Sequence, residues 1–528
     1  MPLAVQALLP LAVLLAAALA VRMRPRRRRN GWIATGSTAL AALIGLIELV
    51  RLAPGERVDV PYLTTFPYAD LLIRLDGLSL AFATITLVTA SLLMLVRQQD
   101  RRDRRDPWSG WLLTSAAVCA LILAGNLLLV YVFLQVVTLA WSGALDERAP
   151  RRLRLRLTLQ IADVGLLLAA ASAIQSVGTS SFSGVPSDTF GVAAFWLMLL
   201  PVVVRLDALA SAARPPVAAV LFGPAIAWLA PAGYVLMRLL ALMGGRLPDR
   251  PTAVLLFLGG ALAALVFATA ALWMPRSARQ PSWLLAAQAA LALALSSAGE
   301  PLATVAAAWL WLLLIPLAGL VSVRVEPRSP AAALTRLQLA MVPATLAFTG
   351  LVLGALTLNA RGLAVAIIPL GLVVFLAAMA VSPGFKFPRV VPRTASDVWA
   401  AVLVLVAAFP GPAISVLVLP VASTARPVPA GTVSTTPLGV QTPLGPWPAL
   451  PVSVLVMAGL IIASRAGAAV PDFGPLIRTR LPRWRAIRLP WRRPASRRLA
   501  PRVLASWWSR AALWGGFGVV LLIALVRP

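Results

Sequence analysis

Few polar side chains in this sequence lie in or beside its long apolar runs, and five of them could take part in proton or ion transfer. They are Gln135, Asp163, Arg205, Asp207 and Arg361. A polar side chain inside a bilayer costs free energy unless it finds a partner, so such residues usually mark an ion pathway or a contact between helices. Each of the five is therefore either part of a proton path or a structural contact.

The composition shows what must position these side chains. Of the 528 residues, 60% are hydrophobic and only 12% are charged, and the mean hydropathy is +0.87. The apolar runs are roughly 17–25 residues long, the length of helix that crosses a bilayer. They lack the ten-residue alternation of a membrane barrel, so the sequence predicts an all-α, polytopic membrane protein.

The basic excess has a topological explanation. The formal net charge is +29, there is no histidine, and Lys386 is the only lysine. Because the arginines lie between apolar runs, they indicate membrane orientation rather than nucleic-acid binding. Imidazole is absent and Cys119 is the single thiol, so we expect no metal centre, no haem and no other cofactor.

The apolar runs predict about sixteen transmembrane helices, with ends uncertain by several residues. These are expected near 3–21, 32–50, 77–96, 109–124, 127–145, 157–174, 190–204, 216–238, 252–274, 282–298, 302–323, 337–358, 362–381, 397–419, 449–464 and 507–526. With sixteen alternating helices, every arginine-rich loop falls on one side, which the positive-inside rule makes cytoplasmic. We therefore expect a multi-pass protein of the cell inner membrane with both termini outside. The first apolar run precedes its charges, unlike a signal peptide, and should remain as a helix.

The domain boundaries follow from these runs. We expect N-terminal helices in 1–108, a core in 109–420, an outer Pro/Thr-rich loop with one helix in 421–464, a basic segment in 465–506 and a terminal anchor helix in 507–528. The basic segment mixes arginine with tryptophan and has prolines at 482, 490, 494 and 501, so it should lie along the inner face against anionic lipid rather than form one continuous helix.

Three motifs occur in a fixed order. They are Asp76-Gly77-Leu78-Ser79-Leu80, "GNLLLVYVFLQ" at 125–135 and "QIADVGLLL" at 160–168. Together they resemble the antiporter-like membrane subunits of respiratory complex I and related cation/proton antiporter complexes, whose patterns read D-G-L-S-L, N-L-L-L-x-Y-x-x-W-E and G-D-x-G-L-L. The segment 214–240 looks like a fourth family block, and the chain's ending is similar to that of the distal subunit. The resemblance implies a 14-helix core followed by a lateral segment and an anchor helix.

The resemblance also implies what has been lost. Gln135, nine residues after Asn126, stands where the family has a membrane-embedded glutamate. The family's partner lysine would fall near Trp196 or Leu197, and neither position is basic. A family histidine on the eighth helix and a lysine on the twelfth are also absent, and Arg361 lies just past the outer end of the latter. An amide has no proton to release near neutral pH.

The remaining charged candidates are harder to interpret. Asp163 matches a family acid and lies close enough to the basic face to pair with an arginine. Arg205 and Asp207 are two residues apart and could form a local ion pair or gate protons, although arginine is a poor proton donor. Prolines within helices, such as Pro201, either mark broken helices or are simply tolerated; around 201–216 the resemblance predicts a break.

Three functions remain open. The first is an antiporter-like subunit of a multi-subunit, complex I-like redox or ion-translocating assembly, with a degenerate proton channel and an accessory role; its partners would be other membrane subunits and anionic lipids at the inner face. The second is a subunit that still translocates protons or cations through its residual polar residues. The third is an unrelated transporter or transferase for lipid-linked substrates. In the first two cases any quinone or NADH dehydrogenase chemistry would belong to other subunits.

Overall fold

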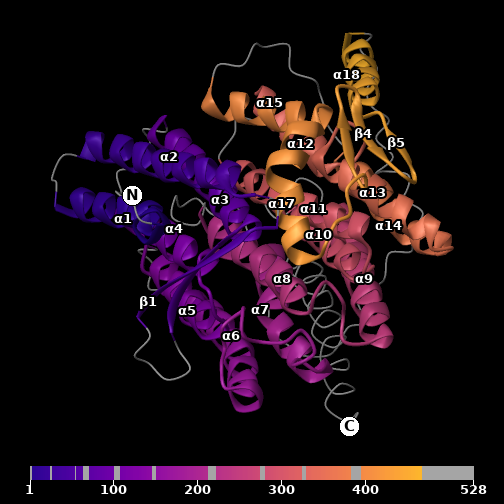
Figure 1. The fold of residues 1–528 in the computed structure, drawn as a ribbon. Coiled ribbons are helices and arrows are strands. Elements are labelled where there is room, and N and C mark those ends of the chain that lie inside the picture. The colour runs from indigo at the N-terminus through magenta and orange to yellow at the C-terminus, as the bar shows by residue number, and fades with distance from the viewer. Residues whose placement is uncertain are drawn as a thin grey trace, which may run out of the picture.

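The computed structural model describes residues 3–23, 27–53, 55–63, 70–99, 108–144, 150–211, 222–273, 280–323, 329–381 and 394–465 (Figure 1). Among them, nine helices are long and apolar enough to cross a membrane, a bent pair would make a tenth, and four shorter apolar helices accompany them. The prediction of an all-α polytopic membrane protein is confirmed. The number sixteen stays a prediction, and the basic segment 465–506 and the anchor helix 507–528 lie outside the described residues, except for Arg465.

The helices of the N-terminal half follow the apolar runs closely. They are α1 (Leu3–Met23), α2 (Arg27–Arg51), α3 (Gly77–Gln99), α4 (Trp108–Ile122), α5 (Leu127–Ala144), α6 (Pro150–Val177), α7 (Val192–Ser211), a π-helix η2 (Gly223–Leu229) and α8 (Ala230–Leu242). Helix α7 continues through Pro201 to Ser211. The part of the predicted break that falls on 212–216 lies outside the described residues.

The C-terminal half differs from the prediction at two places. Its helices are α9 (Arg250–Trp273), α10 (Gln280–Ser296), α11 (Pro301–Ser322), α12 (Pro330–Leu339), α13 (Leu346–Ala360), η3 (Ala364–Ala366), α14 (Ile367–Val381), α15 (Ala395–Ala408), α16 (Pro410–Ala413), η4 (Ile414–Val418), α17 (Leu419–Ala425) and α18 (Ala449–Arg465). The run expected as one helix at 337–358 is divided between α12 and α13, and the run at 397–419 is bent by 89° after α15.

Proline chemistry explains both breaks. Pro343 lies between α12 and α13, and the flanking residues Met341 and Ala344 have φ of 54° and 73°, outside helical geometry. Pro410 follows Phe409, whose backbone is non-helical (φ −117°, ψ 71°). Proline donates no backbone hydrogen bond and disfavours the helical conformation in the residue before it. An apolar run therefore predicts membrane-embedded chain but not an unbroken helix.

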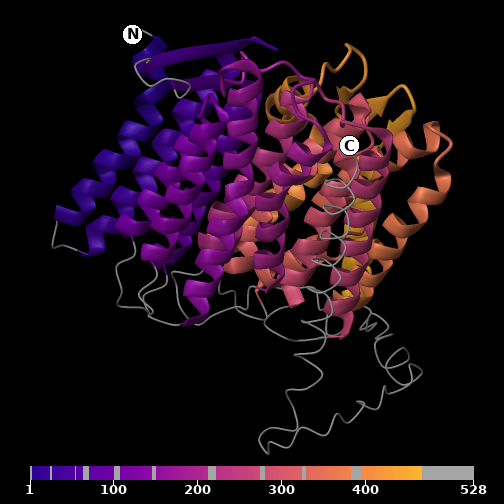
Figure 2. The same ribbon diagram turned by 90° about the horizontal axis from the view of Figure 1, so that it is seen from below.

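One end of the bundle carries all the described strands, and we call it the strand end (Figure 2). The hairpin of β1 (Arg57–Leu63) and β2 (Leu71–Asp76) lies there, with a small sheet of β3 (Ser434–Thr436), β4 (Gly439–Thr442) and β5 (Gly445–Trp447). Isolated bridges Ile73–Ala124 and Asn126–Ser181 join the hairpin to two interhelical turns. Backbone hydrogen bonding thus connects the hairpin between α2 and α3 with the turn between α4 and α5 and the turn between α6 and α7.

Helix α11 forms the centre of the bundle. All of its residues from Leu302 to Val321 are buried, and its Gly319 lies against Thr89 of α3 and Trp399 of α15. Helices α2, α9 and α14 instead expose large apolar side chains on the outside of the bundle. In a protein of this composition those outer surfaces suit lipid or neighbouring membrane chains.

Candidate functional site

A buried ion pair joins α6 to α7. The Nη1 and Nη2 atoms of Arg205 donate to the two carboxylate oxygens of Asp163 over 2.6 and 3.1 Å. The side chains are 1% and 0% exposed. Arg205 Nη1 also donates to the Pro201 carbonyl at 3.2 Å. A bidentate pair of this kind fixes both geometry and charge, because a guanidinium keeps its proton at physiological pH.

The two helices approach closely beside this pair. Pro201 has no N–H, so the carbonyl of Leu197, four residues earlier, cannot receive its helical hydrogen bond. That carbonyl faces Gly165 of α6, where an added Cβ would lie 2.2 Å from the Leu197 oxygen. Only glycine allows this distance. The motif "ADVGLL" therefore supplies both the charged partner, Asp163, and the close-packing position, Gly165.

Gln135 makes a contact between helices at a neighbouring position. Its half-buried side chain donates from Nε2 to the backbone carbonyl of Gln160 at 3.2 Å. Gln160 precedes Asp163 by one helical turn, so the amide lies on the same stretch of α6 as the ion pair. The structure thus brings Gln135, Asp163 and Arg205 together on α5, α6 and α7.

The other two predicted residues lie elsewhere in the arrangement. Asp207 is half-buried on α7, and the ion pair that we considered between it and Arg205 is replaced by the pair with Asp163. Residues two apart on a helix point to different sides, and helix packing places the α6 carboxylate against the guanidinium. Arg361 follows the last residue of α13 at the strand end, where it forms an ion pair with Glu300.

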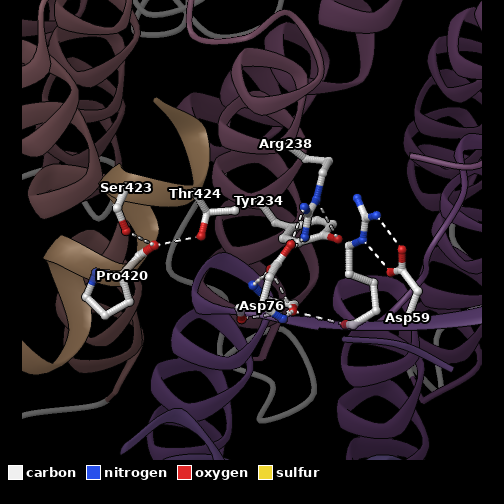
Figure 3. Close-up of polar contacts among 9 residues, drawn as sticks. Asp59, Asp76, Tyr234, Arg238, Pro420, Ser423 and Thr424 are labelled. Atoms are coloured by element: carbon white, nitrogen blue, oxygen red, sulfur yellow. Dashed lines mark hydrogen bonds and ion pairs between the residues drawn. The ribbon is translucent and has the colours of Figure 1, made fainter. Parts of the chain in front are cut away.

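A second buried ion pair was not predicted from the sequence. Arg238 of α8 donates from Nη1 and Nη2 to Asp76 over 2.6 and 3.0 Å, and its Nε donates to the Tyr234 hydroxyl over 3.2 Å (Figure 3). The Asp76 carboxylate also accepts from the backbone N–H of Ser79 at 2.8 Å. Asp76 belongs to the first family-like motif and Arg238 to the segment 214–240. Their opposite charges in two otherwise apolar segments were the sequence signal for this ion pair.

A further ion pair extends this cluster toward the surface. Arg74 of β2 binds Asp59 of β1 through two hydrogen bonds of 2.6 Å. The guanidinium groups of Arg74 and Arg238 lie 5.5 and 5.1 Å from the centre of the Phe182 ring. Both contacts have cation–π geometry, which lets one aromatic side chain stabilise two like charges. The cluster connects the strand end of α3 and α8 to the hairpin and to the turn before α7.

The arrangement controls the ionisation of Asp76, which lies just before the first turn of α3. Burial alone would raise the pKa of this carboxyl, but the charge of Arg238 and hydrogen bonds from Arg238 and Ser79 together hold its pKa below the ordinary value. Asp76 is thus a fixed negative charge at neutral pH. Next to it, an added Cβ on Gly77 would lie 2.6 Å from the Pro420 carbonyl oxygen. The glycine of this motif therefore lets α17 pack closely against the start of α3.

Two small cavities are lined by described residues. One cavity lies among α5, α6, α7 and α8 beside Arg238, and another lies beside Gln288 and Trp309; each is about 10 Å³, room for about one water. Within the described segments no three histidine, cysteine, aspartate or glutamate residues are grouped so as to hold a metal ion.

Comparison with known proteins identifies the class of fold. No protein-family model matches this sequence, and no curated protein matches it. Solved structures do match: the fold is shared with chains of membrane complexes, including respiratory complex I. The resemblance stated from the motifs is therefore confirmed at the level of the fold.

Three of the matching structures illustrate this similarity. A chain of the Mrp complex from Dietzia sp. DQ12-45-1b has a TM-score of 0.69 and 18% identity, with 97% of this chain and 60% of that chain covered. A chain of the membrane-bound sulfane sulfur reductase, an archaeal respiratory membrane complex, has a TM-score of 0.69 and 15% identity, with 99% and 96% covered. A chain of complex I from Thermus thermophilus with bound NADH has a TM-score of 0.58 and 18% identity, with 81% and 100% covered. This chain thus spans 60% of the length of the Mrp-complex chain.

Proposed function

We propose that this chain is an antiporter-like integral membrane subunit of a multi-subunit, complex I-like redox or ion-translocating assembly, in which its own proton channel is degenerate and its role is structural. The shared fold supports the first part of the proposal. Electron transfer would belong to other subunits, because the described residues include no cluster of side chains that could ligate a redox metal.

One observation carries the structural role. The acid expected on α5 is the amide Gln135, which donates to a backbone carbonyl of α6, while the buried acid on α6 is held by an arginine. A switchable acid–base pair needs partners that exchange protons near neutral pH. The amide of Gln135 has no proton to release, and the guanidinium of Arg205 keeps its proton. The Asp163–Arg205 pair therefore stabilises the packing of α6 on α7 instead of gating protons.

Orientation and partners complete the proposal. The strand end would face outside the inner membrane, and the arginine-rich connections at the opposite end would face the cytoplasm. Other membrane subunits would bind the exposed apolar helix faces, and the basic segment 465–506 would lie on anionic lipid at the inner face. Nucleic acid is not expected among the partners.

The test compares the parent assembly with and without this chain in sealed vesicles. Protons translocated per electron should be unchanged when the chain is absent and the remaining subunits assemble, and assembly yield or stability should fall. A lower proton yield from a fully assembled complex lacking the chain would contradict the structural role. Identification of the copurifying chains in the same preparation tests the membership of a complex.

A second candidate function is supported by the burial of Asp163. A completely buried carboxylate in a membrane helix is costly and often functional. If this chain still conducts protons or cations, Asp163→Ala and Asp207→Ala should each abolish translocation while the complex assembles. The matched control is Asp188→Ala, which alters an exposed carboxylate in the turn between α6 and α7. Unchanged coupling in both test variants would exclude this candidate.

The third candidate, a lone transporter or transferase for lipid-linked substrates, is less compatible with the fold. The similarity covers 81–99% of this chain in the three complexes. Purification separates the two classes of function, because a complex subunit should be recovered with its partners and a lone enzyme without them.

A further inference from the structure

Arginines from three separate turns meet at the strand end, on the side of the bundle formed by α9 and α14. Arg246 lies in the turn after α8, and Arg361 and Arg426 follow the last residues of α13 and α17. Glu300, the residue before α11, pairs with Arg361, whose Nε lies 3.0 Å from its carboxylate. The nearby Asp249 carboxylate accepts the N–H of Thr252 at the start of α9.

The position of Arg426 shows how closely these turns approach. Its Nη1 donates to the Gly245 carbonyl at 3.3 Å, and an added Cβ on Gly245 would lie 2.6 Å from the Arg426 side chain. A Cβ on Gly299 would lie 3.7 Å from Arg426 Nη1. Both glycines have positive φ, 73° and 65°. The turns therefore hold the guanidinium between them at a fixed place.

The cluster carries more positive than negative charge. Burial lowers the pKa of Arg426, the attraction of Glu300 raises it, and the neighbouring Arg361 and Arg246 lower it again, so that the pKa lies below the ordinary arginine value. Arg246 is exposed and the Arg361 side chain is 40% exposed. Two guanidinium groups are thus accessible beside a third, with Glu300 as the carboxylate that faces Arg426.

Directly next to this cluster, the bundle exposes apolar surface. On α9, Val254, Leu258 and Leu262 are 49%, 56% and 57% exposed, at successive turns of one helix face. On α14, Ile368 and Leu372 are 67% and 45% exposed. The two helices pack against each other at the edge of the bundle (Figure 1). In a membrane this surface contacts acyl chains, which places the arginines at the level of the headgroups.

We propose that Arg246, Arg361 and Arg426 bind the phosphate of an anionic phospholipid at the strand end, with its acyl chains along α9 and α14. A guanidinium binds phosphate oxygens through paired hydrogen bonds. A phospholipid fits better than a free anion because charged and apolar surfaces adjoin. The site contains no residue of the basic segment 465–506 and does not depend on the proposed function.

The experiment titrates the delipidated full chain in detergent with phosphatidylglycerol or phosphatidylcholine and counts bound lipids by native mass spectrometry. We expect the protein to prefer phosphatidylglycerol. Each accessible arginine near a membrane surface contributes about five-fold in affinity, so Arg246→Gln should lower the preference about five-fold and the double change Arg246→Gln with Arg361→Gln further. Arg57→Gln, which alters an exposed arginine on β1 at the same end, is the matched control and should leave the preference unchanged.

Two results would overturn the lipid site. One is an unmodified protein without a preference for phosphatidylglycerol, or a double variant that keeps it. The other is a rise in melting temperature with inorganic phosphate alone that equals the rise with phosphatidylglycerol, which would indicate a simple anion site. Because Arg361 also pairs with Glu300, its replacement can affect folding; the single variant Arg246→Gln, in an exposed position, keeps the test decisive.

Discussion

The carboxylate of Asp163 on α6 is held by both terminal nitrogens of Arg205 on α7, and neither side chain reaches the surface. Removing one partner of a buried pair leaves the other charge uncompensated, which costs about 3–5 kcal/mol. We therefore expect Asp163→Asn to lower the free energy of unfolding by about this amount. Denaturation of the purified chain in detergent measures it.

The double variant Asp163→Leu with Arg205→Met tests whether the cost comes from the unpaired charge. Replacing a whole buried pair by apolar side chains is often nearly neutral, so the double variant should be more stable than Asp163→Asn. Asp188→Asn, at an exposed turn position, should behave like the unmodified protein. An Asp163→Asn protein as stable as this control would contradict the importance of the pair.

The approach of α6 to α7 predicts a strong effect at one glycine. In Gly165→Ala the new methyl group would lie 2.2 Å from the Leu197 carbonyl oxygen, so the helices must separate, at a cost of about 1–3 kcal/mol. Gly259→Ala on α9 is the control, since no atom lies within 4 Å of its added Cβ. It should be neutral or stabilising. Equal melting temperatures for the two variants would disprove the close contact.

The Asp76–Arg238 pair predicts a pH dependence of stability. The pKa of Asp76 is lower in the folded protein than its ordinary value of 3.8, so the folded state favours the charged form. The pair's contribution is complete above the unfolded pKa and is lost as pH falls through the folded pKa. The stability difference between the unmodified protein and Asp76→Asn should thus be constant from neutral pH to about 5 and shrink below 3.8.

An Asp70→Asn variant provides the comparison for this pH series, because Asp70 is exposed directly before β2 of the same hairpin. It should differ little from the unmodified protein at any pH. A gap between Asp76→Asn and the unmodified protein that widens toward acid would show the opposite sign of linkage and refute the assignment.

Gln135 predicts a structural effect without a functional one. Gln135→Leu loses the hydrogen bond to the Gln160 carbonyl and should cost about 0.5–1.5 kcal/mol of stability. Protons translocated per electron by the assembled complex should not change. A reduced proton yield with normal assembly would mean that the amide belongs to a working path.

Much of the site was predictable one residue at a time. The motif blocks singled out Gln135 and Asp163, which the structure places on neighbouring helices in contact with α6 and α7; the degenerate channel inferred from the absent lysines and histidines stays a prediction. The partner of Arg205 was not predictable, because residues two apart on a helix point to different sides, which disfavours Asp207, and the sequence says nothing of the facing helix. Asp76 and Arg238 likewise stand 162 residues apart in the chain, too far for any local pattern to pair them.

The sequence by itself determined that the chain crosses a membrane many times as helices, because apolar length and backbone hydrogen bonding leave no other choice. It also determined which residue types are available for proton chemistry. Only the tertiary structure decided which charges meet, how closely α6 lies against α7, and where the apolar runs break. Those outcomes depend on contacts between side chains and carbonyls of different helices, and a one-dimensional pattern does not contain the angle and depth at which helices pack.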